Sequence, residues 1–121
     1  MVYTSYFGNI KNLPKNAILV SIARWTPKWF KGYKFPELAP KVDLLKWWKN
    51  SSQTEEDLKL YKKIYNGYLR QKSCLMIYTQ LIFAAKDKDI ILLCYERPSE
   101  FCHRQLVREW FNNNGFKCEE V

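Results

Sequence analysis

Two short apolar runs constrain what this chain can fold into more than any other feature of its sequence. Residues 17–22 follow Pro14, and residues 89–94 repeat the same pattern much later in the chain. Runs with little polar alternation are typical of strands that are covered on both faces. Long amphipathic stretches separate the two runs, so the chain is expected to cross over the sheet through helices. The sequence therefore predicts an α/β domain with a mainly parallel sheet.

Weaker patterns elsewhere complete the predicted elements. Residues 2–7 are aromatic and β-branched, and residues 116–119 follow Gly115, so the predicted sheet has about four strands. The helix at 73–86 is apolar almost all round, and we expect it to be largely buried. The expected architecture is a Rossmann-like layered domain with flanking helices. The other helices are predicted at 40–49, at 54–70 with Thr54 as N-cap, and from Ser99 as N-cap to the stop at 112–115.

Length and charge limit the function classes. A chain of 121 residues fits a single domain, residues 1–121, and an apolar fraction of 47% excludes disorder for most of the chain. The 20 Lys and Arg residues outnumber the 12 Asp and Glu residues, which gives a formal net charge of +8. This balance favours anionic partners, here a phosphate-containing small molecule or single-stranded nucleic acid.

The sequence shows no sign of export or of insertion into a membrane. Residues 1–6 lack a basic region and a long apolar region, and the near-apolar stretch 74–85 is too short to span a bilayer. A cytoplasmic protein without a membrane partner is therefore expected, with its thiols reduced. Cys74, Cys94 and Cys118 lie in apolar segments and are expected to be buried as small hydrophobes, whereas Cys102 lies in a polar segment.

Two places where a predicted strand runs into a loop are candidates for chemistry, because open parallel sheets bind ligands beyond the carboxyl ends of their strands. At the first, Arg24 and Trp25 follow the apolar run 17–22. At the second, Cys94 ends a strand, and a short loop leads into the last predicted helix. The polar and ionisable residues of that second segment are Glu96, Arg97, Cys102, His103 and Arg104.

The start of the last helix is the predicted anion site. With Ser99 as N-cap, Cys102 stands at the third helical position. Free backbone N–H groups and the helix dipole favour an anion there and lower the pKa of a thiol. Arg24 and Arg104 would then hold a phosphate group between them in bidentate fashion.

The remaining predicted roles follow from the chemistry of each residue. Glu96 would orient an arginine or act as acid or base, and His103 would transfer protons. Cys102 would donate to the ligand or act as a nucleophile. No cofactor is predicted. Trp25, Cys94 and Arg97 complete the predicted set of ligand-binding residues.

Each of these features also has a purely structural interpretation. The arginines and Glu96 can pair with one another in a buried network, and His103 can fasten a loop. Cys94, Cys102 and His103 lack the paired short spacings of zinc sites and an evident fourth ligand, so no metal is predicted. A Cys94–Cys102 redox pair is geometrically feasible, but its spacing matches no known redox motif.

Residues 25–36 interleave aromatic side chains with lysines, glycine and proline. A loop of this kind can stack a nucleic-acid base while its lysines contact phosphates. It can equally be a long loop whose tryptophan and phenylalanine side chains anchor it over the core, with the lysines pointing outward. Both interpretations stay open at this point.

The C-x-E-x(5)-C-H-R block from Cys94 to Arg104 is the most specific motif of the chain. It occurs together with segments 3–7, 21–24, 27–30, 38–40 and 110–115. These residues resemble the domain of unknown function 488 family across nearly the whole chain. Many members carry an acidic residue before an arginine in the second strand, and Ser21 and Ala23 depart from that pattern. The resemblance implies an α/β domain without an established substrate, whose shared polar site consists of Arg24, Glu96, Cys102, His103 and Arg104.

The sequence thus leads to one main hypothesis and two alternatives. The main hypothesis is binding of a nucleotide-like or nucleic-acid phosphate ligand at a strand-to-helix junction, with hydrolase or transferase activity on that ligand left open. The first alternative is a non-catalytic, basic nucleic-acid-binding module. The second is an interaction protein whose polar cluster is only a buried structural network.

Overall fold

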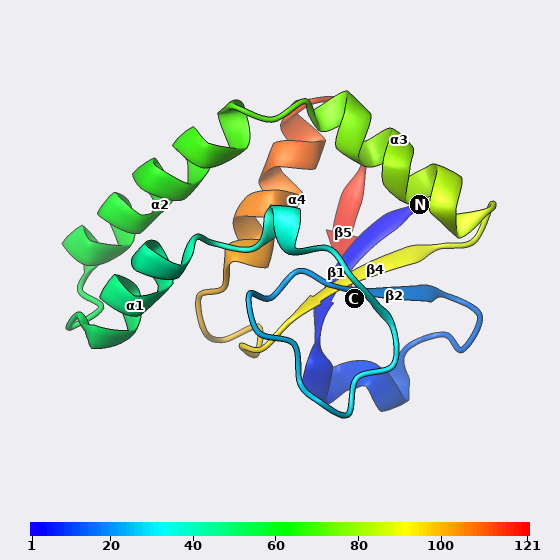
Figure 1. Cartoon of the computed structure of the whole chain (residues 1–121), viewed down its shortest axis with the longest axis horizontal. Coiled ribbons are helices and arrows are strands. Elements are labelled where there is room, and N and C mark those ends of the chain that lie inside the picture. Colours follow the sequence, from blue (N-terminus) through cyan, green and yellow to red (C-terminus); the bar gives the residue numbers. More distant parts are fainter.

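The computed structural model describes residues 1–121 and contains a five-stranded sheet in the order β3-β2-β4-β1-β5. Figure 1 labels four of these strands, β1, β2, β4 and β5, below an arch of helices. All neighbouring strands pair in parallel, which confirms the predicted α/β class. The sheet has one strand more than the predicted number of about four, the short strand β3, which lies inside the segment 25–36 where the sequence pattern predicts a loop. The strands are β1 (Val2–Tyr6), β2 (Ile18–Ser21), β3 (Tyr33–Lys34), β4 (Ile90–Cys94) and β5 (Cys118–Glu120).

Helices connect β3 to β4 and β4 to β5, as the sequence pattern predicts. The hydroxyl of Thr54 accepts a hydrogen bond from the backbone N–H of Asp57, so its predicted role as an N-cap is confirmed. The helices are α1 (Val42–Asn50), α2 (Glu55–Arg70), α3 (Cys74–Ala85) and α4 (His103–Asn113), and the 3-10 segments are η1 (Phe7–Asn12) and η2 (Pro36–Leu38).

The central strand β4 separates two apolar cores. Ile90, Leu92 and Cys94 face the larger core beneath the helices, whereas Ile91 and Leu93 face the smaller one. The smaller core is closed by η1 and by the loop that follows β2, both of which lie on the other side of the sheet from the helices (Figure 1). The coverage of both faces explains why the runs 17–22 and 89–94 lack polar alternation.

Helix α3 is less buried than its composition suggests. Only one of its faces packs inward, through Cys74, Ile77, Leu81 and Ala85. The prediction that this helix is largely buried is wrong. The helix packs on the rest of the protein through one face only, and apolar side chains on its other face lie in solvent. No helix of the chain is both long and apolar enough to cross a bilayer. The exposed large apolar side chains of α3 are Leu75, Met76 and Phe83.

Helix α4 starts later than predicted. Ser99 does not cap it; the helix begins at His103, and Cys102 occupies the N-cap position without a capping hydrogen bond from its side chain. A turn precedes the helix, in which the N–H of Glu100 donates to the carbonyl of Arg97. The turn uses the residues that would have formed the first helical turn, so Cys102 is not at the third helical position.

Candidate functional site

The carboxyl edge of the sheet brings together segments that are far apart in the sequence. Strand β1 continues into η1 on one face of the sheet, whereas the adjacent strand β4 continues into α4 on the other face. Neighbouring parallel strands whose connections leave on opposite faces mark the place where α/β sheets bind ligands. The predicted site residues all lie on the segments that follow β2 and β4 at this edge.

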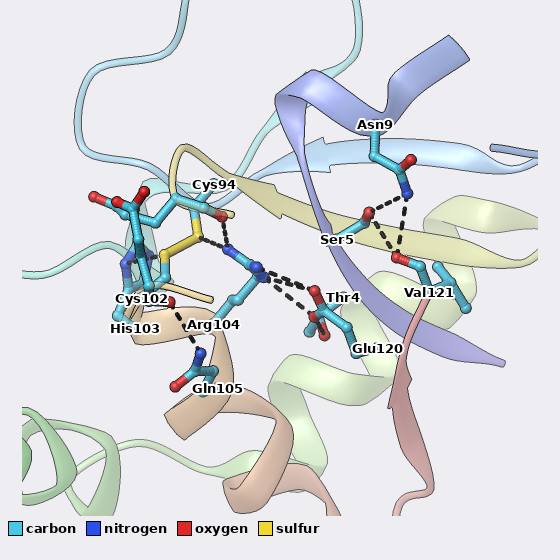
Figure 2. Close-up of polar contacts among 12 residues, drawn as sticks. Thr4, Ser5, Asn9, Cys94, Cys102, His103, Arg104, Gln105, Glu120 and Val121 are labelled. Atoms are coloured by element: carbon cyan, nitrogen blue, oxygen red, sulfur yellow. Dashed lines mark hydrogen bonds and ion pairs between the residues drawn. A yellow bond between two sulfur atoms is a disulfide. The ribbon is translucent and has the colours of Figure 1, made fainter. Parts of the chain in front are cut away.

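The guanidinium of Arg104 is buried, and each of its nitrogens donates a hydrogen bond within the protein. Its Nε and Nη2 donate to the carboxylate of Glu120, with an ion-pair distance of 3.0 Å (Figure 2). Its Nη1 donates to the sulfur of Cys94 at 3.3 Å and to the carbonyl of Glu96 at 2.5 Å. Thr4 donates a further hydrogen bond to Glu120 from its hydroxyl. A bidentate pair of this kind fixes the start of α4 against strands β1, β4 and β5.

The expected phosphate clamp between Arg24 and Arg104 is therefore not formed. The side chain of Arg104 has no exposed surface, and all of its donor nitrogens already have acceptors. Arg24 is half-buried and donates to the carbonyl oxygens of Pro40 and Ala39. Arg24 thus holds backbone in place, and Arg104 pairs with Glu120. No ion pair joins either arginine to the carboxylate of Glu96, so the alternative in which these three residues pair with one another is not formed either.

Cys94 and Cys102 are joined by a disulfide bond (Figure 2). This corrects the expectation that all thiols are free, because the end of β4 and the N-cap of α4 place the two sulfurs side by side. Both residues are buried. Cys74 and Cys118 remain free and buried, in agreement with their prediction as small core residues.

His103 is buried beside the disulfide and is held by two contacts. Its Nε2 lies 2.7 Å from the carbonyl oxygen of Ile22, and its Nδ1 lies 3.7 Å from the sulfur of Cys102. A carbonyl can only accept, so Nε2 carries the proton of the neutral ring and Nδ1 presents a lone pair. Burial, together with the charges of Arg104 and Arg24, lowers the pKa of His103 to about 4 despite its backbone hydrogen bond. The imidazole is therefore neutral at pH 7.

The segment that follows β4 turns toward solvent after Cys94. Tyr95 and Arg97 are exposed, whereas Glu96 is half-buried. Partial burial and, secondarily, the carboxylate of Glu96 raise the pKa of Tyr95. The hydroxyl of Tyr95 donates to the carbonyl of Trp25 at 2.5 Å, which ties the two loops of this edge together.

Three aromatic side chains from these loops form what we call the aromatic surface: Trp25, Trp29 and Tyr95, which are 50%, 61% and 50% exposed. Phe7 supports two of them, with its ring centroid 6.1 Å from that of Trp29 and 5.0 Å from that of Tyr95, and the loop of Trp25 is joined to them through the hydrogen bond of Tyr95. Phe30 packs on Phe7 from inside the core. Phe30 is thus the anchor of the loop, and both tryptophans are left in solvent.

Positive side chains surround the aromatic surface. Lys28 and Lys31 are exposed on the same loop. The ammonium group of Lys49, at the end of α1, lies 5.7 Å from the ring centroid of Trp25. The arrangement offers flat apolar rings next to cations, with Glu96 as the nearby carboxylate.

Sequence reasoning missed two features of this edge. Glu120, the partner of Arg104, lies one residue beyond the strand predicted at 116–119 and was assigned no role, although a buried arginine requires a nearby carboxylate. Tyr95 and Trp29 were not assigned to the site. The signal for Tyr95 was available, because an aromatic residue directly after a buried strand points into the loops at the carboxyl edge.

A large groove of about 950 Å³ lies elsewhere, between α1 and α2. Lys41, Lys63 and Arg70 line it together with Trp47 and Tyr68. None of the predicted site residues contributes to it. We place the candidate site at the carboxyl edge instead, because the chain topology and the exposed rings meet there.

Comparison with known proteins gives one match. The family model DUF488-N3a, described as the active DUF488-N3 subclade, matches residues 8–115. This range contains every predicted site residue, including the block from Cys94 to Arg104. No curated protein and no solved structure matches the chain.

Proposed function

The chain belongs to the DUF488 family, and from that premise we propose that it binds single-stranded nucleic acid through the aromatic surface. The observation that carries the proposal is the exposure of three aromatic rings at the carboxyl edge of the sheet. Clustered rings in solvent are unfavourable unless a ligand covers them, and nucleic-acid bases are flat apolar ligands that stack on them.

The support beneath the rings favours stacking. Phe7 contacts Trp29 and Tyr95 edge-on, and the hydrogen bond from Tyr95 to the backbone of Trp25 fixes the distance between the loops. Rings that are held in place lose little conformational entropy when a base stacks on them. The faces of the tryptophans remain available, because both side chains are at least half exposed.

The lysines next to the rings would bind the phosphate groups of the same ligand. Lys28, Lys31 and Lys49 can contact phosphates on either side of a stacked base, and the net charge of +8 attracts polyanions at a distance. Single strands fit better than duplexes, because the bases of a duplex have no free faces to offer. A mononucleotide shares the same chemistry but contacts fewer lysines.

Hydrolase or transferase chemistry is not part of this proposal. The sulfur of Cys102 is in a disulfide, and the neutral His103 is buried with its Nε2 bonded to Ile22. Neither group is placed to attack or protonate a ligand on the aromatic surface. Binding alone accounts for the exposed rings and the lysines.

Replacing Trp29 with alanine is expected to weaken binding of a labelled oligodeoxythymidine of about 12 nucleotides by about 5- to 150-fold. The loss corresponds to about 1–3 kcal/mol for one stacked base. Fluorescence anisotropy measures the affinity. For wild-type protein, three contacted phosphates predict a slope of about −2 for the logarithm of the binding constant against the logarithm of salt concentration.

Phe83→Ala is the matched control. Phe83 is also an exposed aromatic residue, 84% exposed, but it lies on α3, which leads into the amino end of β4. Its loss should leave the affinity unchanged. Equal effects of the two substitutions, or an affinity that does not depend on salt, would contradict the proposal. Equal affinity for a mononucleotide and the oligonucleotide would instead identify a small-molecule site.

A further inference from the structure

We infer that Cys94, Cys102 and His103 form a zinc site when the disulfide is reduced. One ligand atom from each residue lies within 4.8 Å of the other two. The three ligands come from the end of β4 and the start of α4, two elements that are tied together by the hydrogen bonds of Arg104 to the sulfur of Cys94 and the carbonyl of Glu96. The inference concerns the buried core behind the edge and does not depend on nucleic-acid binding.

The hydrogen bonding of His103 is that of a metal ligand. Nε2–H donates to the carbonyl of Ile22 at 2.7 Å, which leaves the lone pair of Nδ1 directed at the sulfur of Cys102. Histidines that bind metals through one ring nitrogen commonly donate the other N–H to a backbone carbonyl, which fixes the tautomer and the ring orientation. This arrangement is in place before any ion arrives.

The separation of the cysteines suits an ion between them. Their Cα atoms are 7.3 Å apart, beyond the range of about 4.4–6.8 Å that is usual for a direct sulfur–sulfur bond. In a tetrahedral zinc site with zinc–sulfur distances of about 2.3 Å, the two sulfurs lie about 3.8 Å apart. The backbone therefore already allows the wider sulfur spacing that coordination requires.

Charge balance also favours zinc at this place. Two thiolates and one Zn²⁺ add up to zero, which a buried site tolerates far better than two unpaired thiolates. The guanidinium of Arg104 donates to the sulfur of Cys94, and its own charge is balanced by Glu120. Two sulfurs and one imidazole are soft ligands that select zinc over magnesium or calcium. Three protein ligands leave the fourth position to a water molecule or to an atom of an incoming ligand.

Reduction has to precede loading of the metal. A dithiol transfers two electrons and two protons to the Cys94–Cys102 bond, which yields two protein thiols and the disulfide of the reductant. Binding of Zn²⁺ then releases the two thiol protons and forms two zinc–thiolate bonds. Oxidation by a disulfide of the same class reverses the sequence and expels the ion.

The test uses the whole chain, reduced with a dithiol and freed of metal under anaerobic conditions. Titration with Zn²⁺ against a chromophoric chelator is expected to show one tightly bound ion per chain. Co²⁺ as a probe is expected to give thiolate charge-transfer absorption and the intense visible bands of a tetrahedral site. The oxidised protein, with two free thiols instead of four when titrated in denaturant, should bind neither ion tightly.

Variants locate the ligands. Cys94→Ser and Cys102→Ser should each weaken zinc binding by about 100-fold or more. Cys74→Ser removes a buried cysteine outside the cluster and should leave the affinity unchanged. Absence of tight binding by the reduced wild type would overturn the inference, and so would resistance of the disulfide to the dithiol. Equal affinities of Cys74→Ser and Cys94→Ser would do the same. The wild-type titration decides even where a serine variant fails to fold.

Discussion

Replacing Arg104 with alanine is expected to lower the free energy of unfolding by about 3–5 kcal/mol. The side chain has no exposed surface, and its removal leaves the largely buried carboxylate of Glu120 without its partner. The sulfur of Cys94 and the carbonyl of Glu96 lose a donor at the same time. Urea unfolding followed by tryptophan fluorescence measures the change. If Arg104 were instead an exposed arginine that binds an anion, its replacement would leave the free energy of unfolding almost unchanged.

Arg97→Ala provides the control for that measurement. Arg97 stands on the same connection between β4 and α4 but is exposed, so its loss should change the stability by less than about 0.5 kcal/mol. Arg104→Lys keeps the charge but not the bidentate geometry, and an intermediate stability is expected. An Arg104→Ala protein as stable as the wild type would show that the pair with Glu120 contributes little.

Much of the fold follows from local sequence patterns. The runs 17–22 and 89–94 identify β2 and β4, because short apolar runs without alternation are typical of strands covered on both faces. The acidic residues after Thr54 identify the start of α2. Strand β3 has two residues, too few for any pattern, and it exists because its backbone pairs with β2.

The site was harder to predict because its geometry depends on contacts that are distant in the sequence. The partner of Arg104 stands 16 residues later, on a strand at the opposite edge of the sheet from β3. The start of α4 moved because a turn at residues 97–100 competes with the capping pattern of Ser99. The sequence shows neither the pairing of Arg104 with Glu120 nor the turn at residues 97–100. An arginine near the start of a helix then indicates an anion site.

In the aromatic segment 25–36, the sequence identifies the candidate residues but not which of them are exposed. Its composition left stacking and anchoring equally open, and the structure buries one of two neighbouring rings and exposes the other. Phe30 is 8% exposed and anchors the loop, whereas Trp29 is 61% exposed. No local pattern distinguishes these adjacent rings, because the choice depends on which one meets Phe7 from inside the core. Exposure, rather than composition, therefore decides which ring can contact a ligand.

Acidification of the disulfide form is expected to destabilise the protein through His103. Its pKa is about 4 in the folded chain, against an ordinary value of 6.5, with burial as the main cause. Between these two values the unfolded chain binds a proton that the folded chain does not, so stability falls as the pH is lowered. Nothing is lost above about pH 6.5, and about 3 kcal/mol is lost by about pH 4.

His103→Gln separates this effect from the titration of carboxylates. The glutamine amide can still donate to the carbonyl of Ile22, the acceptor that His103 uses at 2.7 Å, but it does not titrate. Urea unfolding at about pH 7.5 and about pH 4.5 should show that the wild type loses about 2–3 kcal/mol more than the variant. Parallel losses in the two proteins would mean that the imidazole of His103 takes up its proton equally well in the folded chain, and hence that the cluster is open to water.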